Sequence, residues 1–198
     1  MKSIAPTLAA IAIAFAGLAG STSAQEKAVS EAKPVKIVME TSKGTIELEL
    51  DAAKAPKTVA NFVSYVKKAH YDGTIFHRVI PGFMIQGGGM TPDLREKSTR
   101  APIAIENRSG LTNKRGTIAM ARTMDPNSAT SQFFINVVDN AMLDPANARD
   151  GFGYAVFGKV VKGMDVVDKI ENVPTTSAGM HQNVPVKPVL ITKATLEK

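Results

Sequence analysis

Apolar and polar side chains alternate along the chain from residue 35 onward. Residues 35–40 and residues 45–50 each have an apolar side chain at every second position, and a short turn at residues 42–44, which contains Gly44, separates the two runs. A period of two is typical of a β-strand with one buried face, and two such runs around a glycine-containing turn predict a β-hairpin. The buried face of this hairpin is expected to carry Val35, Ile37, Met39, Ile46, Leu48 and Leu50.

Two segments have the period of a helix instead. The first begins at Pro56, which suits a first helical turn, and ends at Lys67 and Lys68, whose charges suit a helix C-terminus. Its apolar positions recur at i, i+3, i+4 and i+7 and are Val59, Phe62, Val63 and Val66. A second, shorter helix is predicted over residues 164–170, with an apolar face made of Met164, Val167 and Ile170.

Short apolar segments between glycine, proline and asparagine residues make up the rest of the chain. We predict six further strands, at Ile75–Ile80, Met84–Gln86, Thr117–Ala121, Phe133–Val137, Tyr154–Val161 and Val189–Thr195. Together with the hairpin they give eight short strands and two helices, which is typical of a barrel or a sandwich. The sequence has no internal repeat and no linker-like segment after Pro34, so residues 35–198 are predicted to form one domain.

The first 24 residues have the composition of a secretory signal peptide. Lys2 is their only charge, residues 8–19 are apolar, and residues 20–24 are all small, which predicts cleavage after Ala24. The apolar stretch is shorter than the roughly 20 residues that span a bilayer, so we expect export and no stable membrane insertion. Residues 25–34 are polar and are predicted to form a flexible lead-in to the domain.

Composition removes several classes of chemistry. The chain has no cysteine, which excludes disulfides, thiol nucleophiles and cysteine-based metal sites, and its three histidines, His70, His77 and His181, do not cluster in the sequence. We therefore predict no metal and no cofactor. The formal net charge of +6 is spread thinly, with no basic run among aromatic residues, so nucleic-acid binding is not expected.

Three consecutive glycines, at residues 87–89, do not form a phosphate-binding loop. The Gly-Lys-Ser/Thr ending of such a loop is missing, and Pro92 would disturb a helix that begins there. We interpret the glycines as a bend at which another part of the chain approaches the backbone closely.

Two of the predicted strands carry polar side chains among large apolar ones. Alternation places Phe76, Arg78 and Ile80 on one face of the first strand. The corresponding face of the second strand consists of Gln132, Phe134 and Asn136. Arg78 could lie across the sheet with its stem packed and its charge in water. A cationic donor, amide groups and aromatic rings together are instead typical of a groove that binds polypeptide backbone beside an apolar pocket.

These segments resemble the cyclophilin family of peptidyl-prolyl cis–trans isomerases. The matching motifs are residues 76–88 (FHRVIPGFMIQGG), residues 131–135 (SQFFI), residues 156–160 (VFGKV), Met120-Ala121 and, for the first helix, residues 56–62 (PKTVANF). They follow the family's order and span about residues 35–196. The resemblance implies a mainly β fold, a closed eight-stranded antiparallel β-barrel capped by two α-helices.

The signal peptide and the short connection around residues 91–100 make the chain similar to the bacterial periplasmic branch of this family. The resemblance therefore implies a monomeric periplasmic enzyme. Its partners would be proline-containing polypeptides, whose X–Pro bonds it would rotate while exported proteins fold.

The resemblance also implies roles for individual residues. Those implied in catalysis are Arg78, Phe83, Gln86 and Phe134, with Arg78 as the catalytic arginine. Those implied in substrate binding are His77, Met84, Ala121, Arg122, Gln132, Met142, Leu143 and Tyr154. The proline pocket would be lined by Phe83, Met84, Phe134 and Leu143. Simple alternation does not put Phe83 and Gln86 on one face, so this arrangement requires a local bend, which the nearby glycines permit.

Three positions differ from the better-known cytosolic pattern. Arg122 stands where an asparagine is usual, Tyr154 where a histidine is usual, and Met142 where a tryptophan is common. In relatives that are sensitive to cyclosporin, this tryptophan donates its indole N–H to the drug. Methionine has no such donor, so we expect weak cyclosporin binding.

Two other functions are compatible with parts of the pattern. A proline-motif binding module or holdase chaperone on the same fold would have negligible turnover, and the complete set of Arg78, Phe83, Gln86 and Phe134 argues against it. A small carbohydrate- or lipid-binding barrel would need an apolar lumen and would leave Arg78 without a role. Fold alone does not separate these functions.

Overall fold

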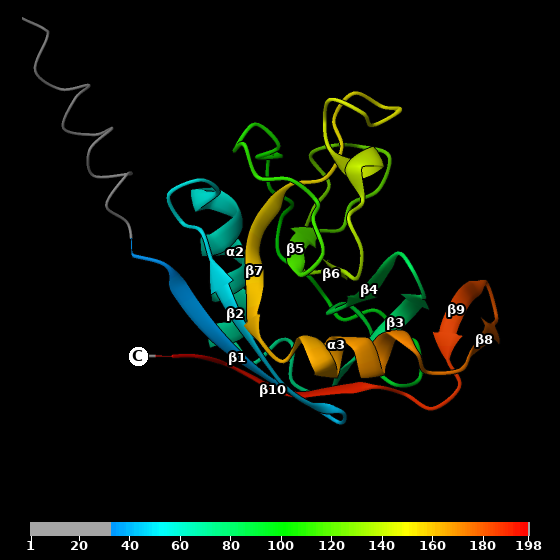
Figure 1. The fold of residues 1–198 in the computed structure, drawn as a ribbon. Helices are drawn as coiled ribbons and strands as arrows, with labels where there is room; N and C mark the ends of the chain where they lie inside the picture. The colour runs from blue at the N-terminus through cyan, green and yellow to red at the C-terminus, as the bar shows by residue number, and fades with distance from the viewer. Residues whose placement is uncertain (1–32, 198) are drawn as a thin grey trace, which may run out of the picture. The chain divides into compact units, whose positions relative to one another are not determined.

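The computed structural model describes residues 33–197, whose strands close into an eight-stranded antiparallel barrel (Figure 1). The order around the barrel is β1 (Val35–Thr41), β10 (Leu190–Leu196), β3 (Thr74–Ile80), β4 (Met84–Gly87), β6 (Phe133–Asn136), β5 (Thr117–Met120), β7 (Val156–Lys162) and β2 (Gly44–Leu50). The predicted fold class is confirmed, and the strand bounds agree with the prediction to within two residues. The predicted signal peptide (residues 1–24) and most of the predicted lead-in (residues 25–34) lie outside the described residues.

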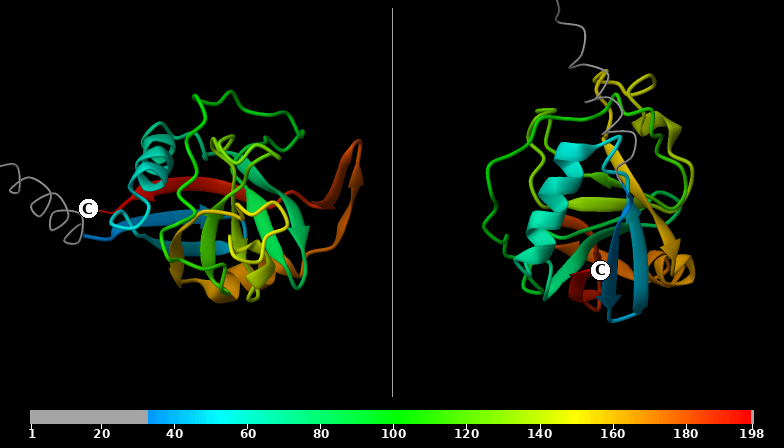
Figure 2. Two further views of the ribbon diagram at one scale, coloured as in Figure 1. Left: turned by 90° about the horizontal axis from the view of Figure 1, so that it is seen from above. Right: turned by 90° about the vertical axis from the view of Figure 1, so that its left-hand side faces the viewer.

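The two predicted helices, α2 (Pro56–Lys67) and α3 (Met164–Glu171), pack on the barrel from different sides (Figure 2). Each contributes its apolar face to the same core as the strands, α2 through Val59, Phe62, Tyr65 and Val66, and α3 through Val166, Val167 and Ile170. The first turn of α2 is capped from a distance, because Glu106 accepts hydrogen bonds from the N–H groups of Lys57 (3.1 Å) and Thr58 (2.8 Å). Within residues 33–197 no helix is long and apolar enough to cross a membrane.

The interior of the barrel is a packed core. The predicted inward residues of the first hairpin that are fully buried are Ile37, Met39, Ile46, Leu48 and Leu50. Large side chains from the other strands, such as Phe76, Phe133 and Phe157, fill the remaining space. A packed interior of this kind does not supply the apolar lumen that a carbohydrate- or lipid-binding barrel would need.

One predicted strand face is wrong. Phe76 does not share a face with Arg78, because β3 has a bulge between them: Phe76 pairs with Gly87 on β4, and Arg78 pairs with Gln86. The extra residue reverses the alternation. Phe76 and Val79 therefore point into the barrel core, whereas Ile80 packs in a second apolar cluster outside it.

The structure contains three elements that the sequence pattern did not predict. One is a short 3₁₀ helix, η1 (Ala141–Leu143). The other two are β8 (Thr175–Ala178) and β9 (His181–Pro185), a hairpin that forms its own two-stranded sheet next to β3 (Figure 1). Neither segment has a run of alternating apolar and polar residues, so the hydrophobic pattern does not indicate a strand or a helix there.

Candidate active site

A cavity of about 230 Å³ opens on the outer face of the barrel, over β3, β4 and β6. Nine of the twelve predicted site residues line it: Arg78, Phe83, Met84, Gln86, Ala121, Arg122, Phe134, Leu143 and Tyr154. They come from segments that are up to 76 positions apart in the sequence, the separation of Arg78 and Tyr154. The barrel therefore assembles most of the predicted site in one place.

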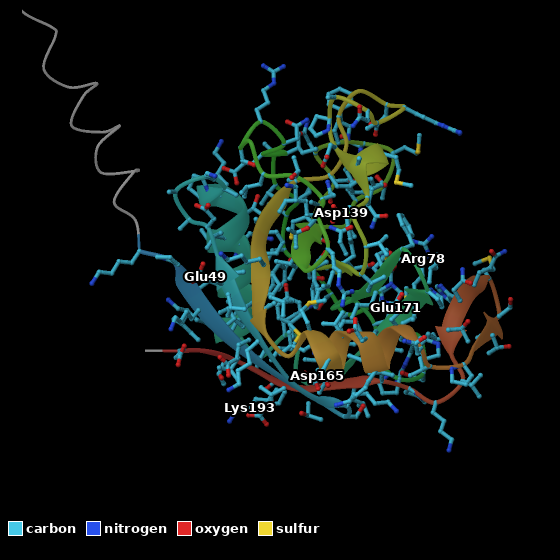
Figure 3. The ribbon with its side chains drawn as sticks, viewed as in Figure 1. Glu49, Arg78, Asp139, Asp165, Glu171 and Lys193 are labelled. Carbon is cyan, nitrogen blue, oxygen red and sulfur yellow. The ribbon has the colours of Figure 1, made fainter. Side chains whose placement is uncertain are left out.

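A cross-strand row forms the polar side of this cavity. Arg78 on β3 lies opposite Gln86 on β4, and Gln86 lies opposite Phe134 on β6. The guanidinium of Arg78 donates through Nη1 to Oε1 of Gln86 (3.3 Å), and Nε2 of Gln86 donates to Oε1 of Gln132 (3.0 Å). This chain of hydrogen bonds orients Arg78 at the cavity rim, on the side of the barrel where β3 and β4 face the β8–β9 hairpin (Figure 3).

The apolar side of the cavity is a second hydrophobic cluster, separate from the barrel core. Its buried members are Met84, Ala119, Phe134 and Val156, and the side chains packed around them include Phe83, Leu143 and Tyr154. The rings of Phe134 and Tyr154 meet edge to face with their centroids 5.5 Å apart. An apolar cup beside a fixed cation suits a small apolar ring attached to a polar chain.

The turn between β3 and β4 carries Phe83 and is held from two sides. Gly82, at φ +68°, donates its N–H to Oε1 of Glu171 at the end of α3 (2.7 Å). The carbonyl of Phe83 accepts from Nδ2 of Asn140 (2.8 Å), which also donates to Oδ1 of Asn136 (2.8 Å). Sequence reasoning missed Glu171 and Asn140 as positioning residues, because these contacts join residues 89 and 57 positions apart and leave no local pattern.

The predicted bend at residues 87–89 is confirmed. A Cβ on Gly88, at φ +86°, would lie 2.8 Å from ring atoms of Phe133 and Tyr71, and a Cβ on Gly89 would lie 2.4 Å from Cγ of Gln132. The missing side chains thus let the segment after β4 pass close to Phe133 and Gln132.

Two of the departures from the family pattern are in contact with each other. The guanidinium carbon of Arg122 lies 4.6 Å from the centroid of the Tyr154 ring. The Arg122 side chain is only 3% exposed; it donates to the carbonyl of Gly153 and forms an ion pair with Asp150. The N–H of Gly153, the Arg122 guanidinium and the N–H of Phe152 lower the pKa of Asp150 to about 2. Arg122 and Tyr154 therefore form one side of the cavity, on which the contacts with Gly153 and Asp150 hold Arg122 in place.

The remaining three predicted residues lie beside this cavity. Gln132 holds Gln86 and lines the neighbouring hollows. His77 is buried in the bulge of β3 and lines a second cavity. Burial, followed by the nearby His181 and Arg78, lowers its pKa to about 4. Met142 is 61% exposed on η1, next to the lining residue Leu143.

The chemistry available at the site is that of a fixed cation, side-chain amides and an apolar cup. In the part of the chain that the structure describes, no three histidine or acidic side chains are grouped so that they could hold a metal ion. The group with the most evident chemical role is thus Arg78, a permanent cation with several N–H donors in a fixed plane.

Proteins that are similar in sequence are named for one activity. Residues 36–196 match the family described as cyclophilin type peptidyl-prolyl cis-trans isomerase/CLD. A peptidyl-prolyl cis-trans isomerase of Acinetobacter baylyi is 63% identical over 155 residues, which cover 78% of this chain and 81% of that protein. Peptidyl-prolyl cis-trans isomerase B of Escherichia coli is 52% identical over 163 residues, which cover 82% of this chain and 99% of that protein.

The fold has a solved counterpart as well. The crystal structure of a cyclophilin type isomerase of Cryptosporidium parvum, determined in the presence of the dipeptide Ala-Pro, superposes with a TM-score of 0.71 at 27% identity. The superposition covers 82% of this chain and 99% of that chain. Because sequence and barrel agree over the whole described domain, the chain belongs to the cyclophilin family of peptidyl-prolyl cis–trans isomerases, and it is an enzyme of that class.

Proposed function

We propose that the enzyme rotates X–Pro bonds in exported polypeptides by stabilising the twisted transition state with Arg78, without a covalent step or a cofactor. The observation that carries this proposal is the guanidinium of Arg78 at the rim of the apolar cavity, oriented by Gln86 and through it by Gln132.

Amide resonance is the obstacle to the reaction. It gives the X–Pro bond a barrier of about 18–20 kcal/mol, so that unaided rotation takes tens to hundreds of seconds. Twisting the bond breaks the conjugation and leaves a lone pair on the prolyl nitrogen. That nitrogen then accepts a hydrogen bond which it cannot accept in the planar ground state. A donation from Arg78 is therefore made mainly in the transition state, where it accelerates the reaction.

Arg78 alone does not supply the whole effect. A turnover of roughly 1–1000 per second would require an acceleration of about 10²–10⁵, which corresponds to about 3–7 kcal/mol. A charged hydrogen bond contributes about 1.5–3 kcal/mol. The rest is assigned to fixing the proline ring among Phe83, Met84, Phe134 and Leu143 while Gln86 and the backbone at Ala121 hold the neighbouring chain.

Replacing Arg78 with alanine tests this proposal. We expect Arg78→Ala to keep its thermal unfolding midpoint and to lose roughly 10–150-fold in kcat/KM in a protease-coupled assay on a short X–Pro peptide. Arg95→Ala is the matched control, since Arg95 is an exposed arginine outside the cavity lining. Near-wild-type turnover by a folded Arg78→Ala protein would exclude the mechanism.

The proposed periplasmic location rests mainly on the first 24 residues. Their single charge, apolar stretch and small residues before Gln25 support export with cleavage after Ala24. Mass spectrometry of the protein purified from its native host is expected to find a chain that begins near Gln25, outside the inner membrane. An intact N-terminus in the membrane fraction would indicate an anchor instead.

A further inference from the structure

One loop begins and ends at the proline cavity, the cavity of about 230 Å³ described above. Residues 144–153 form turns and irregular backbone between η1 and β7 (yellow in Figure 1). Leu143 and Tyr154 stand at the two ends of this loop and both line the cavity. The N–H of Tyr154 donates to the carbonyl of Leu143 (2.9 Å), which closes the loop. The shape of the cavity on this side therefore depends on how the loop is held against the barrel.

Asp150 organises the last part of this loop. Its Oδ1 accepts hydrogen bonds from the N–H groups of Phe152 (2.9 Å) and Gly153 (3.0 Å), and its Oδ2 forms an ion pair with Arg122, which follows β5. The N–H of Gly153, the Arg122 guanidinium and the N–H of Phe152 lower the pKa of Asp150 to about 2, so the carboxylate is charged at neutral pH. Asp150 therefore joins the loop to the barrel by a charge.

The guanidinium of Arg122 is almost fully used in contacts within the protein. Nε (3.0 Å) and Nη2 (2.7 Å) donate to the carbonyl of Gly153, Nη2 also donates to Asp150, and Nη1 donates to the carbonyl of Thr123 (2.9 Å). Four of its five N–H groups thus have acceptors. Because the side chain is only 3% exposed, removal of Asp150 would leave a buried charge without its counter-ion.

The contacts of Arg122 reach the cavity through Tyr154. The guanidinium carbon lies 4.6 Å from the centroid of the Tyr154 ring, and this ring meets Phe134 edge to face. Gly153, at φ +61°, passes so close to Leu143 that a Cβ would lie 2.4 Å from the Leu143 carbonyl oxygen. The end of the loop is therefore packed against Leu143 and bound by Arg122.

We propose that Asp150 is a positioning residue for the isomerase reaction: through Arg122 and Gly153 it keeps Tyr154 and Leu143 where they form one side of the proline cavity. The inference rests on the proposed function, since it requires that the proline ring enters this cavity. Asp150 itself is not among the residues that line the cavity. Because the ion pair acts on the fit of the ring and not on the catalytic arginine, it governs substrate affinity more than the rate of bond rotation.

Asp150→Asn tests the proposal, because asparagine keeps an acceptor for the two N–H groups and loses the charge that pairs with Arg122. We expect KM for a short X–Pro peptide to rise about 3- to 10-fold while kcat stays within about twofold, as a partial loss of apolar contact with the ring would give. The matched control is Asp165→Asn, which removes the exposed ion pair with Lys169 on α3 and is expected to leave KM unchanged.

A second background shows whether Asp150 acts through Arg122. Arg122→Met removes the guanidinium and keeps an unbranched apolar stem, and it is also expected to raise KM. Adding Asp150→Asn to this variant is expected to raise KM no further, because the partner of Asp150 is already absent. The double variant contains neither member of the ion pair, so its comparison with Arg122→Met remains decisive if Asp150→Asn alone fails to fold.

The position of Tyr154 can be observed by NMR. Its ring protons lie beside the Phe134 ring, so their resonances are expected to shift in Asp150→Asn and in Arg122→Met but not in Asp165→Asn.

Three results would overturn the proposal: an unchanged KM in folded Asp150→Asn, unshifted Tyr154 resonances in that variant, or a further rise in KM when Asp150→Asn is added to Arg122→Met. None of them concerns the proposed catalytic mechanism, which the effect of Arg78→Ala on kcat/KM tests by itself.

Discussion

Arg78 owes its position to one extra residue in β3. Without the bulge between Phe76 and Arg78, regular alternation would put the arginine on the face of β3 that Phe76 directs into the core. Burying an unpaired guanidinium there would be very costly. The bulge instead brings the guanidinium to the outer cavity, where Gln86 receives one of its N–H groups.

Lysine is expected to be a poor substitute at this position. Lys keeps the positive charge but lacks the planar array of donors that can serve Gln86 and a prolyl nitrogen together. We expect kcat/KM of Arg78→Lys to lie within about tenfold of the value for Arg78→Ala. The measurement is the protease-coupled assay on both variants, after thermal unfolding shows that both are folded. Full activity of Arg78→Lys would mean that charge alone is sufficient.

Met142 is predicted to limit cyclosporin binding. It is 61% exposed beside Leu143, so a larger side chain has room there. An indole N–H would add a hydrogen bond of about 0.5–1.5 kcal/mol together with aromatic contact area. We therefore expect Met142→Trp to bind cyclosporin at least about tenfold more tightly in calorimetric titration, with little change in kcat/KM.

The control for this prediction is Met124→Trp, which introduces the same side chain at another exposed methionine. Tight binding of cyclosporin by the unmodified protein would show that the drug contact does not depend on position 142.

At the scale of elements, two distant segments hold the β3–β4 turn in place. One is the segment that follows β6, and the other is the C-terminal end of α3. Asn140 anchors the carbonyl of Phe83 and Glu171 anchors the N–H of Gly82. Asn136 joins Asn140 to Asn113, so the turn rests on a buried amide network. The proline cavity is therefore shaped by α3 and by the segment before η1 as much as by its own strands.

Removal of the Asn140 side chain is expected to affect both stability and activity. Asn140 is buried, and Asn140→Ala leaves the carbonyl of Phe83 and Oδ1 of Asn136 without this donor. We expect the free energy of unfolding in urea to fall by about 1–3 kcal/mol and kcat/KM to fall several-fold as Phe83 shifts. Asn172→Ala, at the exposed end of α3, is expected to change neither by a comparable amount. Unchanged values for Asn140→Ala would show that the turn holds its shape without the network.

At the scale of the whole molecule, one buried and one half-buried histidine link stability to pH. Burial lowers the pKa of His77 from 6.5 to about 4, and burial also lowers the pKa of His70. Between these two pH values the unfolded chain binds more protons than the folded one, so the free energy of unfolding decreases as pH falls from about 6.5 to about 4. His77 is neutral in both states above this window and protonated in both below it.

The share of His77 in this loss can be measured. The lowering of the His77 pKa from 6.5 to about 4 corresponds to a loss of about 3 kcal/mol in the free energy of unfolding across this pH window. We expect urea unfolding at several pH values to show a clear decline for the wild type and a shallower one for His77→Gln. His181→Gln is expected to lessen the decline only in part, because His181 is one of the nearby groups that lower the pKa of His77. Equal slopes for the wild type and His77→Gln would assign the decline to other groups.

The spacing of apolar residues was sufficient to predict the elements that have one buried face. The β1–β2 hairpin and both helices have one apolar face each, and the period of the apolar residues in the sequence predicts that face. The family motifs around Arg78, Phe134 and Phe157 were specific enough to identify the barrel. They also predicted nine residues that line one cavity.

Contacts between distant segments were decided only by the tertiary structure. The local sequence pattern does not predict which residues will meet in such contacts. Examples are the bulge at His77, the capping of α2 by Glu106, the anchoring of Gly82 by Glu171 and the contact of Arg122 with Tyr154. The sequence by itself determined the buried faces of the first hairpin and of both helices, and the family of barrel to which they belong. Strand register and long-range hydrogen bonds decided where Arg78, the apolar side of the cavity and the β8–β9 hairpin lie relative to one another. Both depend on which segments become neighbours once the barrel has closed.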